Sequence, residues 1–383
     1  MAIGIALQVA VIGAGIAGAV CARTLTTAGH QVHIFDKSRG PGGRLATRRL
    51  EWVDRQGQPC TTRIDHGAVG FTAHSEAFQT FVDQAIEAGS LAEWAPRLAA
   101  GTLVAEAGGL LYVPTPDMPA LCRGLLEGTS AHWSFAVDGL HKNPLGWQVQ
   151  AGSTRHPHMF DAVVLALPPA QAAPLLGPHR RDWARHASIA PMQPCWTLMG
   201  IADTSSPCSG APEAAAAWQV ARPSTGPLAW VLRNDSRPGR ARVPGQAHWV
   251  AHARAGWSRR HLEQPAAWVQ QQMQAALAEC LNRPVDWLAC TVHRWRYAVP
   301  KAQKPASTQA CWWDAAQGLG VCGDFLGGSG VEGAWLSAQS LAAALLQRAS
   351  NSGVTSADGG AHEVVDEAAD EAARVPPWPS CVH

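Results

Sequence analysis

Residues 7–49 read LQVAVIGAGIAGAVCARTLTTAGHQVHIFDKSRGPGGRLATRR, and this stretch decides the fold. The apolar run 9–12 predicts a buried parallel strand, and residues 31–35 predict a second strand that ends at Asp36. Small residues over 16–28 predict a helix between the two strands, preceded by glycines spaced G-x-G-x-x-G. Strand, glycine turn, helix and second strand together predict a unit that binds a dinucleotide.

Each glycine of this turn has a mechanical reason. The first allows a tight turn, the second lets the backbone approach a pyrophosphate, and the third lets the helix pack closely on the strand. Free N–H groups and the dipole at the helix N-terminus attract phosphate, and a carboxylate 18 residues after the last glycine can accept both ribose hydroxyls. The residues expected to contact the nucleotide are Gly13, Ala14, Gly15, Ile16, Ala17, Gly18, Asp36 and Lys37.

The loop after Asp36 distinguishes between nucleotides. A nicotinamide-binding half would continue into another helix, but here Gly40-Pro41-Gly42-Gly43-Arg44 follows. Two glycines permit an unusual turn, and the Arg44 guanidinium could then reach the pyrophosphate. This arrangement resembles the extended FAD-binding signature of glutathione-reductase-like and amine-oxidase-like flavoproteins, which implies cofactor contacts from Gly43 and Arg44. A basic surface loop after a nicotinamide-type unit is the alternative.

A matching half lies near the other end of the chain. A short strand is expected at 318–322, followed by Gly323-Asp324, a glycine-rich turn at 327–330 and a helix from 331. In the same flavoproteins such a Gly-Asp holds the ribityl and phosphate region, and the helix that follows points its N-terminus at the flavin ring. The resemblance therefore implies that Gly323, Asp324, Val331 and Glu332 contact the cofactor. The alternative is an Asx turn that caps a core helix.

The middle of the chain is expected to supply the rest of the fold. Strands are predicted at 135–137, 147–150, 162–167 and near 195–201, 228–233 and 248–253, with helices at 75–88 and near 263–281. Residues 64–68, Ile-Asp-His-Gly-Ala, resemble a further flavoprotein element. The resemblance implies that His66, Gly67 and Ala68 pass the flavin and that Val137 contacts adenine.

Taken together, the chain resembles the renalase-like branch of the flavin amine oxidase superfamily. The most specific matching pieces are DKSRGPGGRLATRR, LRNDSRPGR, WVAHARAGWSRRHLE and HRWRYAVP, and the resemblance runs over about residues 8–346. It implies non-covalent FAD and hydride transfer to flavin N5 from 2- or 6-dihydro isomers of NAD(P)H, with O₂ as acceptor. Asp36 departs from the superfamily's commoner glutamate, and Gly70-Phe71 departs from an aromatic residue placed one position earlier.

The resemblance also implies a two-domain α/β architecture. A Rossmann-like FAD-binding domain is expected over 1–75, 115–172 and 295–349, and a discontinuous mixed-sheet substrate domain of the amine oxidase type over 76–114 and 173–294. Residues 350–383 carry six acids and one arginine and are predicted to form a flexible acidic tail, dispensable for flavin binding, with a short helix near 363–373.

Several side chains have the chemistry to line the substrate face. Asn234 can read a carboxamide, His252 can hydrogen-bond substrate or steer flavin reoxidation, and Arg240 could meet phosphate. A loop asparagine, a satisfied core histidine and a surface arginine are the structural alternatives. Trp257 and Tyr297 are further candidates, and Lys301 resembles the water-bridging lysine of many amine oxidases.

Composition sets the remaining expectations. A length of 383 residues suggests two domains, 47% hydrophobic residues suffice for a large core, and a net charge of +1 gives no whole-chain field for nucleic acid. No long apolar run or signal segment is seen, so a cytoplasmic protein, monomer or homodimer, is expected. Ten scattered cysteines without a C-x-x-C or Cys/His spacing predict reduced thiols and no metal.

Two other functions remain open at this stage. One is a flavin amine oxidase or desaturase that acts on an amine or apolar small molecule. The other is a non-catalytic flavoprotein in which FAD is structural. Amine oxidase sites tend to flank the amine with aromatic walls, and the chain has only 2 tyrosines, although its 17 tryptophans could take their place.

Overall fold

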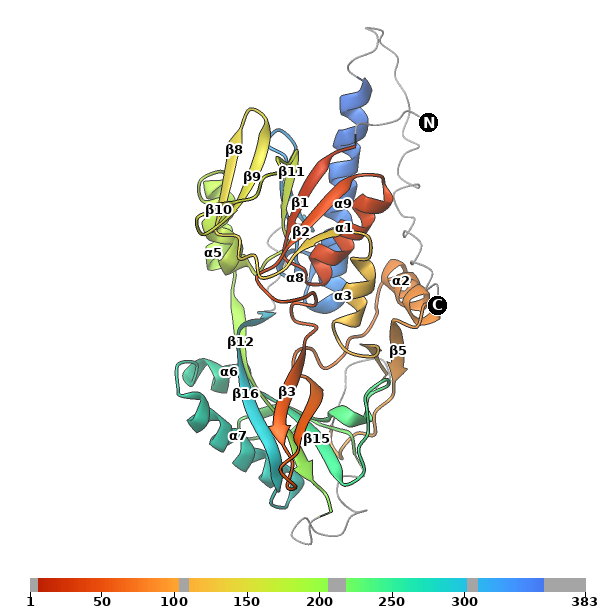
Figure 1. Ribbon diagram of the computed structural model, residues 1–383, viewed down its shortest axis with the longest axis vertical. Helices are drawn as coiled ribbons and strands as arrows, with labels where there is room; N and C mark the ends of the chain where they lie inside the picture. Colours follow the sequence, from red (N-terminus) through yellow and green to blue (C-terminus); the bar gives the residue numbers. More distant parts are fainter. Residues whose placement is uncertain (1–5, 103–109, 206–217, 302–308, 355–383) are drawn as a thin grey trace.

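The computed structural model describes residues 6–102, 110–205, 218–301 and 309–354 of the 383-residue chain. A six-stranded sheet lies at one end of the molecule and a five-stranded sheet at the other (Figure 1). Two long strands of the second sheet, β12 (Met192–Asp203) and β16 (Trp287–Pro300), reach toward the first. The mixed α/β fold expected from the sequence is confirmed.

The six-stranded sheet is parallel except at one edge. Its order is β17-β18-β11-β1-β2-β7, and only β17 runs antiparallel. The carboxyl ends of the parallel strands therefore meet at one edge, where nucleotides bind in folds of this kind. The strands are β1 (Gln8–Ile12), β2 (Gln31–Phe35), β7 (Ser130–His132), β11 (Ala162–Leu165), β17 (Trp312–Asp314) and β18 (Leu319–Val321).

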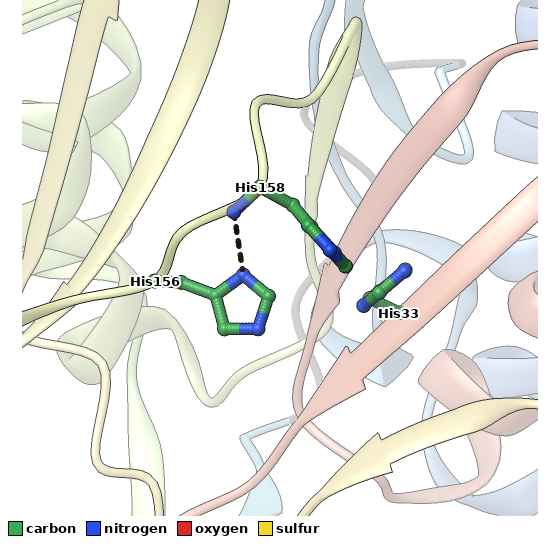
Figure 2. Close-up of side chains that lie close together, drawn as sticks. All are labelled: His33, His156 and His158. Carbon is green, nitrogen blue, oxygen red and sulfur yellow. Dashed lines mark hydrogen bonds between the residues drawn. The ribbon is translucent and has the colours of Figure 1, made fainter.

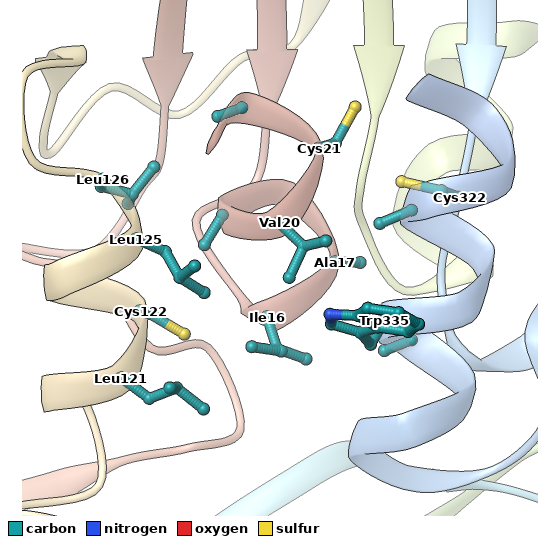
Figure 3. Packing of buried hydrophobic residues seen from close by; sticks show 14 of the residues in the cluster. Ile16, Ala17, Val20, Cys21, Leu121, Cys122, Leu125, Leu126, Cys322 and Trp335 are labelled. Atoms are coloured by element: carbon teal, nitrogen blue, oxygen red, sulfur yellow. The ribbon is translucent and has the colours of Figure 1, made fainter. Parts of the chain in front are cut away.

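Alternate residues of β1 enter two different cores, as the two-residue period of a strand requires. Val9 and Val11 pack under α1, α3 and α9, and Figure 3 shows α1 between the other two helices. Ala10 and Ile12 pack on the opposite face with α4 and α5. The helices are α1 (Ile16–Thr27), α3 (Ala120–Leu125), α4 (Pro169–Leu176), α5 (Arg181–Ile189), α8 (Asp324–Gly327) and α9 (Gly330–Val354), and β8 (Gly139–Asn143), β9 (Gly146–Ala151) and β10 (Thr154–Arg155) form a small sheet beside them.

The second sheet is antiparallel, with the order β13-β14-β15-β12-β16. One face packs on α7, and the other packs on the hairpin of β3 and β4 and on the pair β5 and β6. The remaining elements are β3 (Thr47–Val53), β4 (Pro59–Asp65), α2 (Glu76–Glu87), β5 (Leu91–Trp94), β6 (Leu111–Pro114), β13 (Val220–Ala221), β14 (Leu228–Arg233), η2 (Asn234–Ser236), β15 (Gln246–Ala253), α6 (Ala255–Arg260) and α7 (Ala266–Leu281).

Three expectations from the sequence need adjustment. No strand forms at 135–137, because Ser134 turns the chain with a φ of +55° and Phe135 donates instead to the Asp36 carbonyl. Helix α2 packs in the same core as α1 and α9 rather than with the second sheet. Helix α9 continues to Val354, past the predicted start of the tail, and the helix predicted near 363–373 lies outside the described residues.

Two further expectations concern thiols and membranes. The eight cysteines within the described ranges are all free, as predicted. Among the helices of those ranges, none is long and apolar enough to cross a bilayer.

Candidate cofactor and substrate site

The glycine turn after β1 leaves a cradle of bare backbone. Gly13 has a φ of +108°, and a Cβ at Gly18 would overlap the carbonyl oxygen of Gly13. The first turn of α1, with Ile16 and Ala17, therefore packs directly against the backbone at the end of β1. Such a turn brings main-chain N–H groups to a bound phosphate, and any side chain at Gly18 would disturb it.

Asp36 lies against this turn. Its two carboxylate oxygens accept the N–H groups of Ala14 and Ser38, each at 2.7 Å. Because each oxygen can accept further hydrogen bonds, these contacts are compatible with the ribose role expected for Asp36. Lys37 is exposed beside it, and Val137 lies half-buried in the segment after β7.

Arg44 joins the N-terminal signature to the C-terminal one. Its Nη1 and Nη2 donate to the two oxygens of buried Asp324 at 2.6 and 2.8 Å, and Nη1 also donates to the Ala298 carbonyl at 3.1 Å. Two motifs 280 positions apart thus meet in one bidentate ion pair. Both Nη atoms are engaged with Asp324, so a pyrophosphate contact would have to use Nε or the second N–H of Nη2.

The segment after β4 runs along the same loop. A Cβ at Gly67 would overlap the Arg44 carbonyl oxygen, and the Ala68 N–H donates to that oxygen at 3.0 Å. Gly323, with a φ of +154°, donates its N–H to Ser337 Oγ at 2.9 Å. The loops that carry Gly43, His66 and Asp324, which the sequence assigned to one cofactor, therefore lie together.

Glu332 has a contact that the sequence did not suggest. Its carboxylate accepts the N–H groups of His74 and Ser75 at 3.0 and 2.7 Å and the Ser75 hydroxyl at 2.6 Å. This side chain caps the N-terminus of α2 and ties it to α9. Beside it, Val331 is buried in the first core.

Three histidines, His66, His252 and His293, meet at the face of the second sheet; we call them the substrate-side histidines. Strand pairing puts Trp230, His252, Thr197 and His293 in one row across the sheet, with all four side chains on the same face. His66, at the end of β4, lies over this row, and its ring centroid is 4.8 Å from that of His293. Trp295 stacks on His66 at 5.2 Å.

The substrate-side histidines are neutral near pH 7. Burial lowers the pKa of His66 to about 3, helped by the charges of His293, Arg48 and His252. Burial and the charge of Arg237 lower the pKa of His252 to about 4, and burial and Arg48 lower that of His293. Each ring can therefore donate one hydrogen bond and accept another.

Acid should destabilise the folded protein before its carboxylates protonate. Between pH 6.5 and about 4 the unfolded chain binds protons on His66 and His252 that the folded chain does not, so the free energy of unfolding falls as pH is lowered. The contribution is about 1.4 kcal/mol for each unit of pKa difference. We expect urea midpoints to fall from pH 6.5 to 5 in wild type and to fall less in His252→Gln. An equal fall in both would contradict the assignment for His252.

Behind these histidines lies a buried ion cluster formed by Asp65, Arg237 and Arg240. Asp65 pairs with Arg237 Nη1 at 3.0 Å and with Arg240 Nη2 at 2.7 Å, and it accepts the Thr47 hydroxyl at 2.6 Å. Burial raises the Asp65 pKa, but the two guanidinium charges and these hydrogen bonds outweigh it, so the pKa lies below its ordinary value. Asn234 is buried beside the cluster and accepts the Asp65 N–H at 3.2 Å through Oδ1.

The prediction that Arg240 meets phosphate is wrong. Its Nε and Nη2 hold Asp65, and Nη1 donates to the carbonyls of Pro114 and Pro238 at 2.6 and 2.7 Å. The guanidinium is buried, with a side-chain exposure of 5%, and cannot also bind an anion from solvent.

Trp257, expected at the substrate face, lies elsewhere in the structure. It lies on α6 and stacks on Trp268 at 6.2 Å, on the face of the second sheet opposite the substrate-side histidines. Tyr297 lies half-buried on β16, in the stretch between Trp295 and Val299 where the pairing of β16 with β12 is irregular. Lys301 is exposed just after β16, and its N–H donates to the Pro191 carbonyl at 2.9 Å.

His293, Trp295 and Arg48 also belong to the site, although the sequence did not indicate them. His293 and Trp295 stand four and two residues before Tyr297 in HRWRYAVP, and the two-residue period of a strand would have placed His293 and Trp295 on one face. Arg48 is exposed, and its charge acts on both His66 and His293, which places a cation at the rim of the site.

Comparison with known proteins agrees with this fold. The family model of the NAD(P)-binding Rossmann-like domain matches residues 11–85. One curated relative is the tRNA 5-methylaminomethyl-2-thiouridine biosynthesis bifunctional protein MnmC of Magnetococcus marinus. It is 31% identical over 210 residues, which cover 45% of this chain and 31% of the relative, so the chain spans about a third of that protein's length.

Solved structures match nearly the whole chain. A protein assigned as protoporphyrinogen oxidase from Exiguobacterium sp. 255-15 has a TM-score of 0.65 at 11% identity, covering 90% of this chain and 99% of that one. Cyclohexylamine oxidase from Brevibacterium oxydans IH-35A has a TM-score of 0.57 at 13% identity, covering 89% and 99%. The chain therefore has the mixed α/β fold of the flavin amine oxidases, with a Rossmann-like nucleotide-binding part.

Proposed function

We propose that this protein is an FAD-dependent oxidoreductase of the amine oxidase type. The loops around the first sheet fit the cofactor, because Gly13, Gly18 and Gly67 let backbone segments approach one another more closely than any Cβ would allow. The N-terminus of α1 would hold the pyrophosphate, Asp36 the ribose, and the loops of Gly43, His66 and Asp324 the flavin end. Bound FAD would supply the hydride acceptor, and O₂ would reoxidise it.

We propose further that the substrate is a 2- or 6-dihydro isomer of NAD(P)H, in line with the renalase-like resemblance. One observation carries this proposal: His66 Nδ1, His252 Nε2 and Asn234 Nδ2 are buried polar atoms without a hydrogen-bond partner. Buried polar groups are normally satisfied, so three unmet ones beside one face favour a polar ligand there. A carboxamide has the donors and acceptor to meet neutral imidazoles and an amide.

Charge at the site favours this substrate over a cationic amine. The charges near the substrate-side histidines are those of Arg48, Arg237 and Arg240, and Asp65 is occupied by the two buried arginines. An ammonium ion would meet like charge, whereas the phosphates of a dinucleotide could pair with exposed Arg48. The ring needs no base in the site, because a dihydronicotinamide becomes aromatic when it loses hydride. The neutral side chains need only orient it.

The cofactor part is tested by denaturing the purified protein and identifying the released chromophore. We expect stoichiometric FAD. Release of FMN, or no flavin after reconstitution, would contradict the proposal at its first step. A protein that retains FAD but is reduced by no donor would favour the non-catalytic alternative.

His252→Ala should slow anaerobic flavin reduction by a dihydronicotinamide isomer without releasing FAD. Loss of a hydrogen bond to a buried group costs about 1–3 kcal/mol, which corresponds to about 5- to 150-fold in rate. His261→Ala serves as the control, because the His261 ring packs at a tilt against Trp257 and Trp268, which lie at the opposite face of the same sheet. Rapid-mixing absorbance measures both variants, and equal reduction rates in them would remove His252 from the substrate site.

A further inference from the structure

A second group of histidines lies within the first domain, away from the substrate-side histidines. His33 is on β2, and His156 and His158 lie in the segment between β10 and β11 (Figure 2). One potential ligand nitrogen from each ring lies within 4.8 Å of the others. His33 and His156 are buried and His158 is exposed, so the group is held from within and open to solvent on one side.

A fourth imidazole supports this group from behind. His132 Nε2 lies 3.1 Å from His33 Nδ1, and the His132 ring lies 4.6 Å from that of His156. A neutral imidazole has one N–H and one lone pair, so His33 can donate to His132 and still offer its other nitrogen. Metal-binding histidines are usually fixed by such a second bond, which sets the tautomer and the ring orientation.

The packing around the group is aromatic. Phe35 stacks on His132 at 4.6 Å, and Phe35 and Phe160 lie 5.0 and 5.7 Å from His156. Among the hydrogen bonds and ion pairs of the described chain, none joins a carboxylate to His33, His156 or His158. A metal cation binds the lone pair of a neutral imidazole, and three potential ligand nitrogens lie close together here.

We propose that His33, His156 and His158 form a binding site for a divalent transition metal ion such as Zn²⁺. Imidazole nitrogens suit Zn²⁺, Ni²⁺ and Cu²⁺, and three of them leave a fourth position for water. Bonds of about 2.0–2.1 Å would require the nitrogens, which lie within 4.8 Å of one another, to close to roughly 3.3 Å, and rotation of the exposed His158 ring can adjust its own distances to the other two.

The ion would join three separate elements. His33 belongs to the interior of the six-stranded sheet, His132 ends its edge strand β7, and His156 and His158 follow the small β8–β10 sheet. Phe135 packs on Phe35 at 5.3 Å in the loop that follows β7, two residues before Val137. Metal binding would therefore fix the loop that the sequence assigned to adenine, a structural role at one end of the nucleotide site.

The test is equilibrium dialysis of the flavin-loaded, tag-free protein against Zn²⁺, with metal content measured per chain. We expect one Zn²⁺ per chain and at least tenfold weaker binding in His158→Ala, whose exposed side chain should leave folding unchanged, and in His156→Ala. His141→Ala is the matched control, because His141 lies on β8, where its Nε2 is 2.7 Å from Gln150 Oε1, and it is not part of the histidine group. Absence of stoichiometric binding, or equal binding in wild type and His158→Ala, would overturn the site.

Discussion

Asp65→Ala is expected to lower the free energy of unfolding by about 3–5 kcal/mol, because it leaves buried guanidinium groups without a counter-charge. Arg237 and Arg240 have side-chain exposures of 1% and 5%, so water cannot replace the lost carboxylate. The same change removes the acceptor of Thr47, whose hydroxyl bonds Asp65 at 2.6 Å. Urea denaturation, followed by flavin and tryptophan fluorescence, measures the loss.

Asp286→Ala provides the comparison for a surface pair. Asp286 accepts Arg55 Nη2 at 2.5 Å, but the two side chains are 35% and 53% exposed. Exposed pairs contribute about 0–1 kcal/mol, so this variant should unfold close to wild type. If both aspartate variants shifted the urea midpoint equally, the buried cluster would not be the stabilising feature described here.

Gly18→Ala is expected to yield protein with little or no bound flavin. The new Cβ would overlap the Gly13 carbonyl oxygen and approach the Ala166 side chain, so α1 must move away from β1. Overpacking of this kind costs about 1–3 kcal/mol or more. Because the phosphate is bound at this turn, the same free energy corresponds to FAD binding that is about 5- to 150-fold weaker. Titration of the apoprotein with FAD measures the change.

Gly40→Ala is the matched control within the same nucleotide region. Gly40 has an ordinary negative φ, and nothing lies within 4 Å of the position its Cβ would take. This variant should bind flavin as wild type does. Retention of full FAD affinity in Gly18→Ala would mean that the turn after β1 does not hold the pyrophosphate.

The sequence was most informative where local geometry decides structure. The glycine spacing and the two apolar runs predicted β1, α1 and β2 to within one or two residues, because glycine contacts and strand periodicity are local properties. The two motifs that carry Arg44 and Asp324 were assigned to one nucleotide site, but the ion pair between them was not predicted.

Side-chain partners across long separations were not predictable in this way. The sequence suggested Arg240 as a phosphate ligand, because no residue near it in the sequence indicates a contact with Asp65, 175 positions away. Trp257 follows His252 by only five positions, yet the sheet separates their side chains. The group of four imidazoles comes from residues 33, 132, 156 and 158, so only the tertiary fold reveals that they lie together.

We propose that neutral polar groups on the second sheet present a dihydronicotinamide to bound FAD. Anaerobic rapid mixing of the flavin-loaded protein with 2- and 6-dihydro isomers of NAD(P)H tests it most directly, with ordinary NAD(P)H and a primary amine as comparison donors. We expect the isomers to bleach the oxidised flavin rapidly and the comparison donors to bleach it slowly. The reason is that a displacement of about 1 Å at the reacting carbon can slow hydride transfer about a hundredfold. Rapid bleaching by the amine, with none by the isomers, would contradict it.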